Sequence, residues 1–212
     1  MKLLILLLAC AAIGHAGAQT MSQQPPVADT RLATEVAGKS LSTLSQLVTE
    51  ENYRAMGFES PREAADAKLG VPIPVYMVQL DELRAYAGGD PAALLRPLPQ
   101  VVFPVNVGGA TRSGITVENA GKGWQATGFG SAALTRALAD AIRASGAAEP
   151  MAVHVAALRT YFIGFRAGDG TLMFAPIRDE PEFEFRAGAP VPATQALLAL
   201  RPAAVRYNGL PL

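Results

Sequence analysis

The sequence predicts an α+β protein in which an antiparallel sheet of hairpins, a meander, carries two main helices. Two observations predict the sheet: apolar residues alternate with other side chains over 99–127, and glycine-rich turns interrupt the alternation. The third observation is an amphipathic helical pattern over 131–145, directly after the last of these strands. These segments predict a three-stranded meander closed by a helix, and the flanking segments are interpreted around this unit.

The amino-acid composition indicates a globular protein and argues against a nucleic-acid-binding one. The chain has 212 residues, of which 50% are apolar, so it can bury a core without a metal or a disulfide. Its 18 basic and 18 acidic residues give a net charge of zero and are scattered along the sequence. A nucleic-acid partner is not expected, because no cluster of positive charge is present to bind a phosphate backbone.

The first residues resemble an export signal. Met1-Lys2 is a short positive start, Leu3–Gly14 is apolar, and Ala16-Gly17-Ala18 has the small-x-small pattern of a cleavage site. We expect residues 1–18 to be a signal peptide cleaved after Ala18, which predicts a periplasmic or secreted protein. The apolar run is about a dozen residues long, shorter than the ~20 that cross a bilayer, so no transmembrane segment is predicted.

Cleavage after Ala18 would remove Cys10, the only cysteine, and Lys2. The mature chain would then carry 17 basic and 18 acidic residues, a net charge of −1, and no disulfide. A lipoprotein anchored through Cys10 is disfavoured, because only seven apolar residues, Leu3–Ala9, precede it, at the lower limit of the 7 to 15 typical of a signal.

Three segments are expected in the mature chain. Residues 19–29 contain Gln-Gln-Pro-Pro and predict a flexible linker. Residues 30–57 predict an N-terminal helical segment, with a helix to about Val48. A surface helix is favoured over a partner-binding or membrane-skimming one, because the segment lacks a basic face. Residues 58–212 are expected to form a single α+β domain.

The first half of that domain has clear local signals. Ser60-Pro61-Arg62-Glu63 has the pattern of a capping box and predicts a helix over 61–69. Val71–Leu80 is strand-like, and Pro72 and Pro74 place its beginning at a sheet edge, because proline cannot donate to a ladder.

The central unit follows. Val101–Val107 alternates, Gly108-Gly109 predicts a tight hairpin, and Trp124–Thr127 predicts the third strand. Ser131 is expected to cap the following helix, in which Arg136 and Asp140 would pair. Further along, strands are expected over 151–157, 161–166, 171–177 and 182–185, and a short helix over 192–200 before a proline-broken tail.

A weak internal sequence repeat suggests a degenerate duplication. Val75-Tyr76 leads to Leu83-Arg84-Ala85-Tyr86, and Val153-His154 leads to Leu158-Arg159-Thr160-Tyr161. Each is followed by an apolar hairpin with glycines at its turn. Composition alone also produces such matches, and the period of about 75 residues lies outside the range of solenoid repeats.

Catalytic signals are sparse. Residues 128–133 fit G-x-G-x-x-A, but the preceding strand belongs to a meander, so a tight turn is favoured over a dinucleotide site and no cofactor is predicted. His154, the only histidine of the mature chain, is interpreted as a structural residue, and no metal site is predicted. The acidic residues of 179–184 are read as the solvated face of a strand.

These observations predict a non-catalytic binding or accessory module of the cell envelope, with an envelope protein or a small ligand as partner, contacted through a sheet edge and loops. The candidate binding residues are Trp124, Arg112 and Tyr76. The alternative is a carboxylate-dependent hydrolase of envelope glycans, which requires two carboxylates roughly 5 to 9.5 Å apart across a groove. A purely structural envelope protein, the oligomeric state and the strand order are left open.

Overall fold

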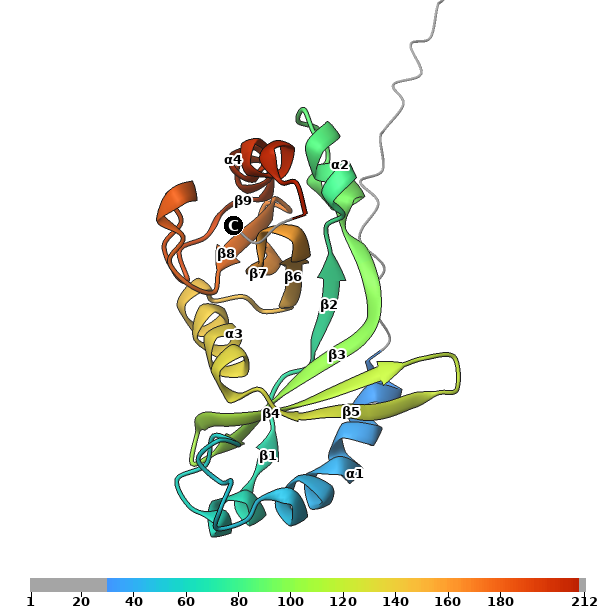
Figure 1. Cartoon of the computed structure of the whole chain (residues 1–212), viewed down its shortest axis with the longest axis vertical. Helices are drawn as coiled ribbons and strands as arrows, with labels where there is room; N and C mark the ends of the chain where they lie inside the picture. Colours follow the sequence, from blue (N-terminus) through green and yellow to red (C-terminus); the bar gives the residue numbers. More distant parts are fainter. Residues whose placement is uncertain (1–29, 210–212) are drawn as a thin grey trace, which may run out of the picture.

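The computed structural model describes residues 30–209, in which one nine-stranded sheet carries helices on both faces (Figure 1). The predicted signal peptide and linker lie outside these residues. The helices are α1 (Arg31–Leu47), α2 (Leu80–Ala85), α3 (Ala132–Ser145) and α4 (Ala193–Arg206). The strands are β1 (Lys68–Leu69), β2 (Ile73–Met77), β3 (Arg96–Val107), β4 (Ala110–Asn119), β5 (Trp124–Gly130), β6 (Met151–Val155), β7 (Thr160–Arg166), β8 (Leu172–Pro176) and β9 (Val191–Pro192). The predicted α+β class is confirmed.

The sheet consists of two halves that meet at its centre. Its order is β5-β4-β3-β2-β6-β7-β8-β9, with β1 beside β3, and only β2 and β6 pair in parallel. Each half runs through a central strand, a short connection, a hairpin, an edge strand and a long helix. The two segments of the weak sequence repeat begin in β2 and β6, the first strand of each half. The duplication itself stays a prediction.

Strand β2 lies at the centre of the sheet, but its beginning, where Pro72 and Pro74 predict a sheet edge, has a neighbouring strand only on the β3 side. Pairing with β6 begins only at Val75, opposite Ala152, so Pro74 precedes the parallel ladder and its missing N–H breaks no bond there. On the other side, the register with β3 shifts between Pro74 and Tyr76. The irregular start of β2 therefore accommodates proline inside the sheet.

The predicted meander and helix over 99–145 are confirmed. Gly108 and Gly109 connect β3 to β4 with φ angles of 58° and 83°, the left-handed conformation that a tight hairpin needs. Ser131 precedes α3, but its side chain makes no capping hydrogen bond. Asp140 pairs with Arg143 at 3.2 Å, so the predicted pair with Arg136 is wrong.

The predicted helix over 61–69 is also wrong. Residues 61–66 form a 3-10 helix, and Lys68 and Leu69 leave it to pair with β3. The expected capping box does not form: the Ser60 side chain makes no capping hydrogen bond, and the Glu63 carboxylate accepts the N–H of Glu59 at 2.6 Å. Pairing with the sheet replaces the last helical turn.

Two predictions near the C-terminus fail as well. Residues 182–185 are not a strand, because 181–183 form a 3-10 helix and a single bridge joins Glu180 to Phe185. The last helix does not end at 200 but continues through Pro202 to Arg206. Leu197, Leu200, Ala203 and Ala204 are all buried, so packing of this face offsets the hydrogen bond that proline removes.

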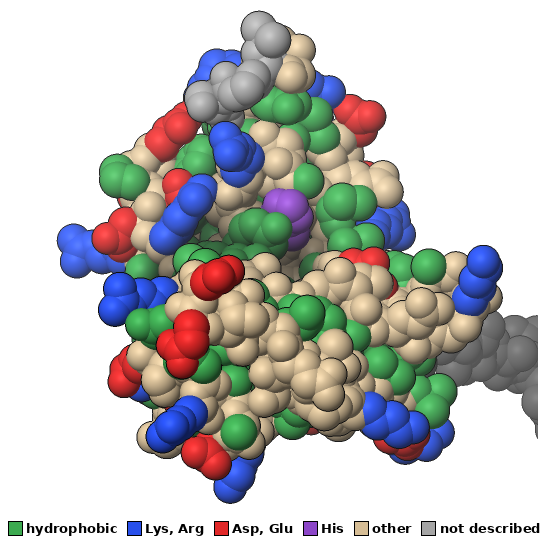
Figure 2. All heavy atoms as spheres, turned by 60° about the horizontal axis from the view of Figure 1, so that its bottom comes forward, with side chains coloured by type: hydrophobic (Ala, Val, Ile, Leu, Met, Phe, Trp, Pro, Cys, Tyr) green, Lys and Arg blue, Asp and Glu red, His purple; other side chains and the backbone are tan. Residues whose placement is uncertain are grey.

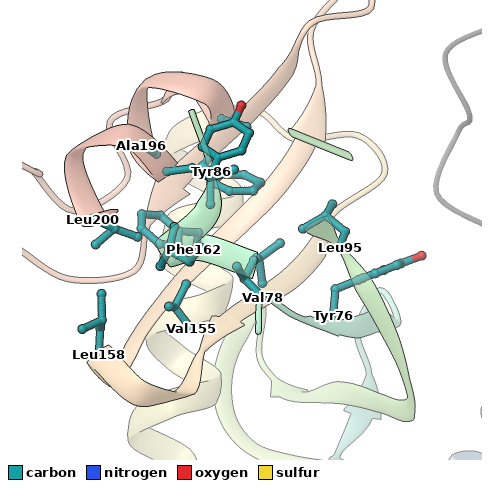
Figure 3. Close-up of a cluster of buried hydrophobic side chains, with 14 of the residues drawn as sticks. Tyr76, Val78, Tyr86, Leu95, Val155, Leu158, Phe162, Ala196 and Leu200 are labelled. Atoms are coloured by element: carbon teal, nitrogen blue, oxygen red, sulfur yellow. The ribbon is translucent and has the colours of Figure 1, made fainter. Parts of the chain in front are cut away.

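Three apolar clusters hold the helices to the sheet. The α3 face of the sheet packs against Leu138 and Ala141 of α3. The opposite face packs on α4 in the second half and on α1 in the first half. Figure 3 shows the α4 cluster, in which Phe162 lies among side chains of several elements. Among the helices of the described residues, α3 alone packs on the first face, and part of that face stays open.

Helix α1 confirms the expectation of a surface helix packed on the domain. Ala33, Ala37 and Leu44 are buried, whereas the larger apolar side chains of Leu32 and Leu47 are exposed. After α1 the chain turns at Gly57, whose φ is 97°. A Cβ at Gly57 would lie 1.9 Å from the Arg112 carbonyl oxygen, so this turn touches β4 directly.

Two glycine substitutions test this packing. Gly57→Ala should lower the free energy of unfolding by about 2–4 kcal/mol, because it adds backbone strain and a clash. Gly38→Ala, the control in the middle of α1 with open space around it, should raise it by about 0.5–1 kcal/mol. Urea unfolding measures both, and equal midpoints for the two variants would contradict the close approach of this turn to β4.

Candidate functional site

The α3 face contains two neighbouring rows of side chains that cross four strands. The inner row is Val75, Ala152, Ile163 and Ala175, which pair in register from β2 to β8. All four are at least 95% buried, and they share a cluster with Leu138 and Ala141 of α3. Helix α3 therefore covers the inner row completely.

The outer row lies two residues after the inner row in β2 and β6, two residues before it in β7 and directly after the end of β8, and it is only half-buried. It consists of Met77, His154, Tyr161 and Ile177. Met77 pairs with His154, His154 pairs with Tyr161, and the Ile177 N–H donates to the Tyr161 carbonyl at 3.2 Å. Since neighbouring strands lie about 4.8 Å apart, the row is about 14 Å long. We call these four residues the outer row.

An aromatic stack lies at the centre of the outer row. The rings of His154 and Tyr161 are 3.9 Å apart between centroids and 7° from parallel. Burial lowers the pKa of His154 and raises the pKa of Tyr161. Both side chains are therefore neutral near pH 7, and within residues 30–209 no hydrogen bond engages the imidazole nitrogens or the phenol oxygen.

His154, the one histidine among the described residues, lies in a recess of the surface. Figure 2 shows the histidine at the bottom of a hollow with hydrophobic side chains on both sides. Leu98 and Val102 of β3 and Ile142 of α3 extend this apolar surface, because they are partly exposed and pack against the same cluster. The hollow thus offers an apolar floor with two unused polar groups.

The polar groups of the outer row can form hydrogen bonds with a molecule in the hollow. A neutral imidazole offers one donor and one acceptor, and a phenol offers both from one oxygen. The outer row contains no carboxylate and no nucleophile beside the histidine. In the described part of the chain, no three His, Cys, Asp or Glu side chains gather as metal ligands.

Trp124, predicted to bind, lies at the start of the edge strand β5, opposite Asn119 of β4. It is half-buried against the α1 cluster. Arg112 lies near the other end of β4, about 20 Å away along the strand. The structure does not bring these two residues together.

Arg112 is the extra residue of a β-bulge, since Val105 pairs with Ser113 while the next residue of β3 pairs with Thr111. Its guanidinium forms two ion pairs, Nη2 to Glu59 at 2.6 Å and Nε to Glu63 at 2.8 Å. Glu63 is only 13% exposed, so this cluster holds the 3-10 helix at 61–66 against β4.

Tyr76 lies in β2 and is 2% exposed, at the margin of the α4 cluster. Figure 3 shows its hydroxyl pointing away from Phe162 and Leu200. Burial raises the pKa of Tyr76. It faces away from the outer row, because Met77, its neighbour, points to the α3 face. The binding roles of Trp124, Arg112 and Tyr76 stay predictions.

The outer row was largely missed from the sequence. His154 was noted, but as a structural residue, and Met77, Tyr161 and Ile177 carried no signal of their own. The row exists only through the register of four strands, two of which are separated by more than 70 residues of chain. Alternation showed that these residues share strand faces, but not which strands are neighbours.

Comparisons with known proteins add no function. No family model matches the chain, and neither a curated protein nor a solved structure matches it. Among residues 30–209, no helix combines the length and the apolar character needed to cross a membrane.

The half-buried His154 predicts a pH-dependent stability. Because burial lowers the pKa of His154 below its ordinary 6.5, the unfolded chain takes up a proton before the folded one as the pH falls. Stability should therefore be full above about pH 7 and decrease below pH 6.5. His154→Gln should flatten this change in urea midpoints between pH 8 and 5.5, while Tyr161→Phe, the control, should retain it. An equal slope in His154→Gln would contradict the assignment.

Proposed function

We propose that this protein is an exported, non-catalytic binding module of the cell envelope whose outer row holds a small apolar ligand. The observation that carries the proposal is the half-exposed stack of His154 and Tyr161 between Met77 and Ile177. Aromatic and sulfur-containing side chains in a hollow, with few polar groups, are typical of ligand sites. The export signal predicted over residues 1–18 supports the compartment.

The two polar groups should select the ligand. Covering about 200 Å² of apolar surface is worth about 5 kcal/mol, close to the lower bound of the 4–15 kcal/mol that association costs. Apolar contact alone therefore gives weak binding. A ligand with a hydrogen-bonding group near the ring edges of His154 and Tyr161 would bind better, because the imidazole and the phenol still have hydrogen-bond donors and acceptors to offer in the hollow.

The alternative function, hydrolysis of envelope glycans with two carboxylates, has less support. Glu59 and Glu63 are neighbouring carboxylates, but the guanidinium of Arg112 lies between them and pairs with both. This arrangement supports a structural role, because the acid and base of a glycosidase must face a sugar across open space. The hydrolase stays an untested prediction.

A neutral apolar dye, Nile red, tests the proposed site. The mature protein should bind it saturably, and Met77→Lys should weaken binding about tenfold, because it places a charge in the row. Gln79→Lys, the control, adds the same charge at an exposed position two residues beyond the row and should bind like the unchanged protein. Equal affinity of both variants, or no saturable binding by the unchanged protein, would contradict the proposal.

A further inference from the structure

The two ends of the sheet differ in how their edges are protected. At one end, β9 has two residues, one of which is a proline, and short edge strands with proline are a common protection against pairing with another chain. At the other end, β5 has seven residues. Within 30–209, no segment other than β4 hydrogen-bonds to the backbone of β5.

The composition of β5 leaves this edge open. Its sequence, Trp-Gln-Ala-Thr-Gly-Phe-Gly, contains no charged residue and no proline. The strand has two irregularities: a bulge at Thr127, since Thr116 pairs with Gly128 while Val117 pairs with Ala126, and a φ of 97° at the buried Gly130. The exposed and regular backbone before the bulge, Trp124–Ala126, can still accept a neighbouring strand.

The apolar core is incomplete along the same edge. Trp124, Ala126 and Phe129 pack against the α1 cluster, yet all three are partly exposed. Gln125 points to the other face and is exposed. A strand added to β5 would cover the three apolar side chains with its own alternate residues and would place polar residues beside Gln125.

We propose that β5 takes up an extended segment of another protein as an additional antiparallel strand. The charge pattern on and beside β5 indicates the composition of that segment. Its middle must be uncharged, because it would lie against a strand without charges. Lys122 is exposed in the turn before Trp124 and forms no ion pair within the described residues. In an antiparallel arrangement the C-terminal end of the segment reaches this turn, so an acidic residue is expected there.

This proposal goes beyond the small-ligand site, and the two can fail separately. The outer row lies on β2, β6 and β7 and at the end of β8, whereas β5 is separated from β2 by β3 and β4. Both surfaces require only that the protein is a binding module. Main-chain hydrogen bonds would supply the affinity at β5, and the alternating side chains would supply the specificity.

Amide hydrogen exchange on the mature protein tests the edge, with the synthetic peptide acetyl-Thr-Val-Ser-Val-Thr-Val-Ser-Glu as the probe. The peptide should slow exchange in residues 124–130 about tenfold or more, and Gln125→Lys should weaken its binding about tenfold. Gln79→Lys serves again as the control and should leave peptide binding unchanged. Lys122→Glu should weaken binding of this peptide about threefold to fivefold, because two negative charges then meet. The same variant should bind normally to a peptide in which Lys replaces the C-terminal Glu.

Three results would overturn the proposal. No slowing at millimolar peptide would show that β5 does not accept a strand. If exchange in residues 124–130 is slow without peptide and slows further as the protein concentration rises, a second copy of this chain occupies the edge. If exchange is slow without peptide at every protein concentration, the chain's own residues occupy it. Nile red binding is measured on the same samples, so a failure at β5 is separable from a failure at the outer row.

Discussion

The fold depends on the parallel pairing of β2 with β6. Three residue pairs, from Val75–Ala152 to Met77–His154, make the only parallel contact among the strands of residues 30–209 and join the two antiparallel halves of the sheet. On one face, Tyr76 and Val153 continue the α4 cluster across this joint. On the other face, α3 lies over the inner row. Without this pairing the halves would be separate sheets, and neither the inner row nor the outer row would exist.

The position of α3 explains why the outer row is open. Gly114 of β4 allows the helix to approach, since a Cβ there would lie 2.4 Å from the Thr135 hydroxyl oxygen. From this contact α3 crosses to β7 and β8 and covers the inner row. It does not bury the carboxyl ends of β2 and β6, so Met77 and His154 remain half-exposed. Helix α3, fixed by its contact with Gly114, therefore covers the inner row and leaves the outer row accessible.

Local signals in the sequence predicted local structure well. Alternation and the Gly108-Gly109 turn predicted the β3–β4 hairpin, and the apolar stripe predicted α3, because each depends on residues close in the chain. Long-range pairing overrode local preference elsewhere. Lys68-Leu69 joined β3 instead of a helix, and β2 lies at the centre of the sheet despite Pro74. The outer row could not be predicted for the same reason, since His154 becomes a site residue only through its neighbours Met77 and Tyr161.

The central claim is that the outer row is the ligand-binding surface, and methionine methyl spectra test it most directly. In protein labelled at the methionine methyl groups, titration with Nile red should shift the Met77 signal and leave that of Met56 unchanged. Met56 is a suitable reference because it packs against the α1 cluster beside Gly130, on the opposite face of the sheet. A titration that shifts Met56 and leaves Met77 in place would contradict the account.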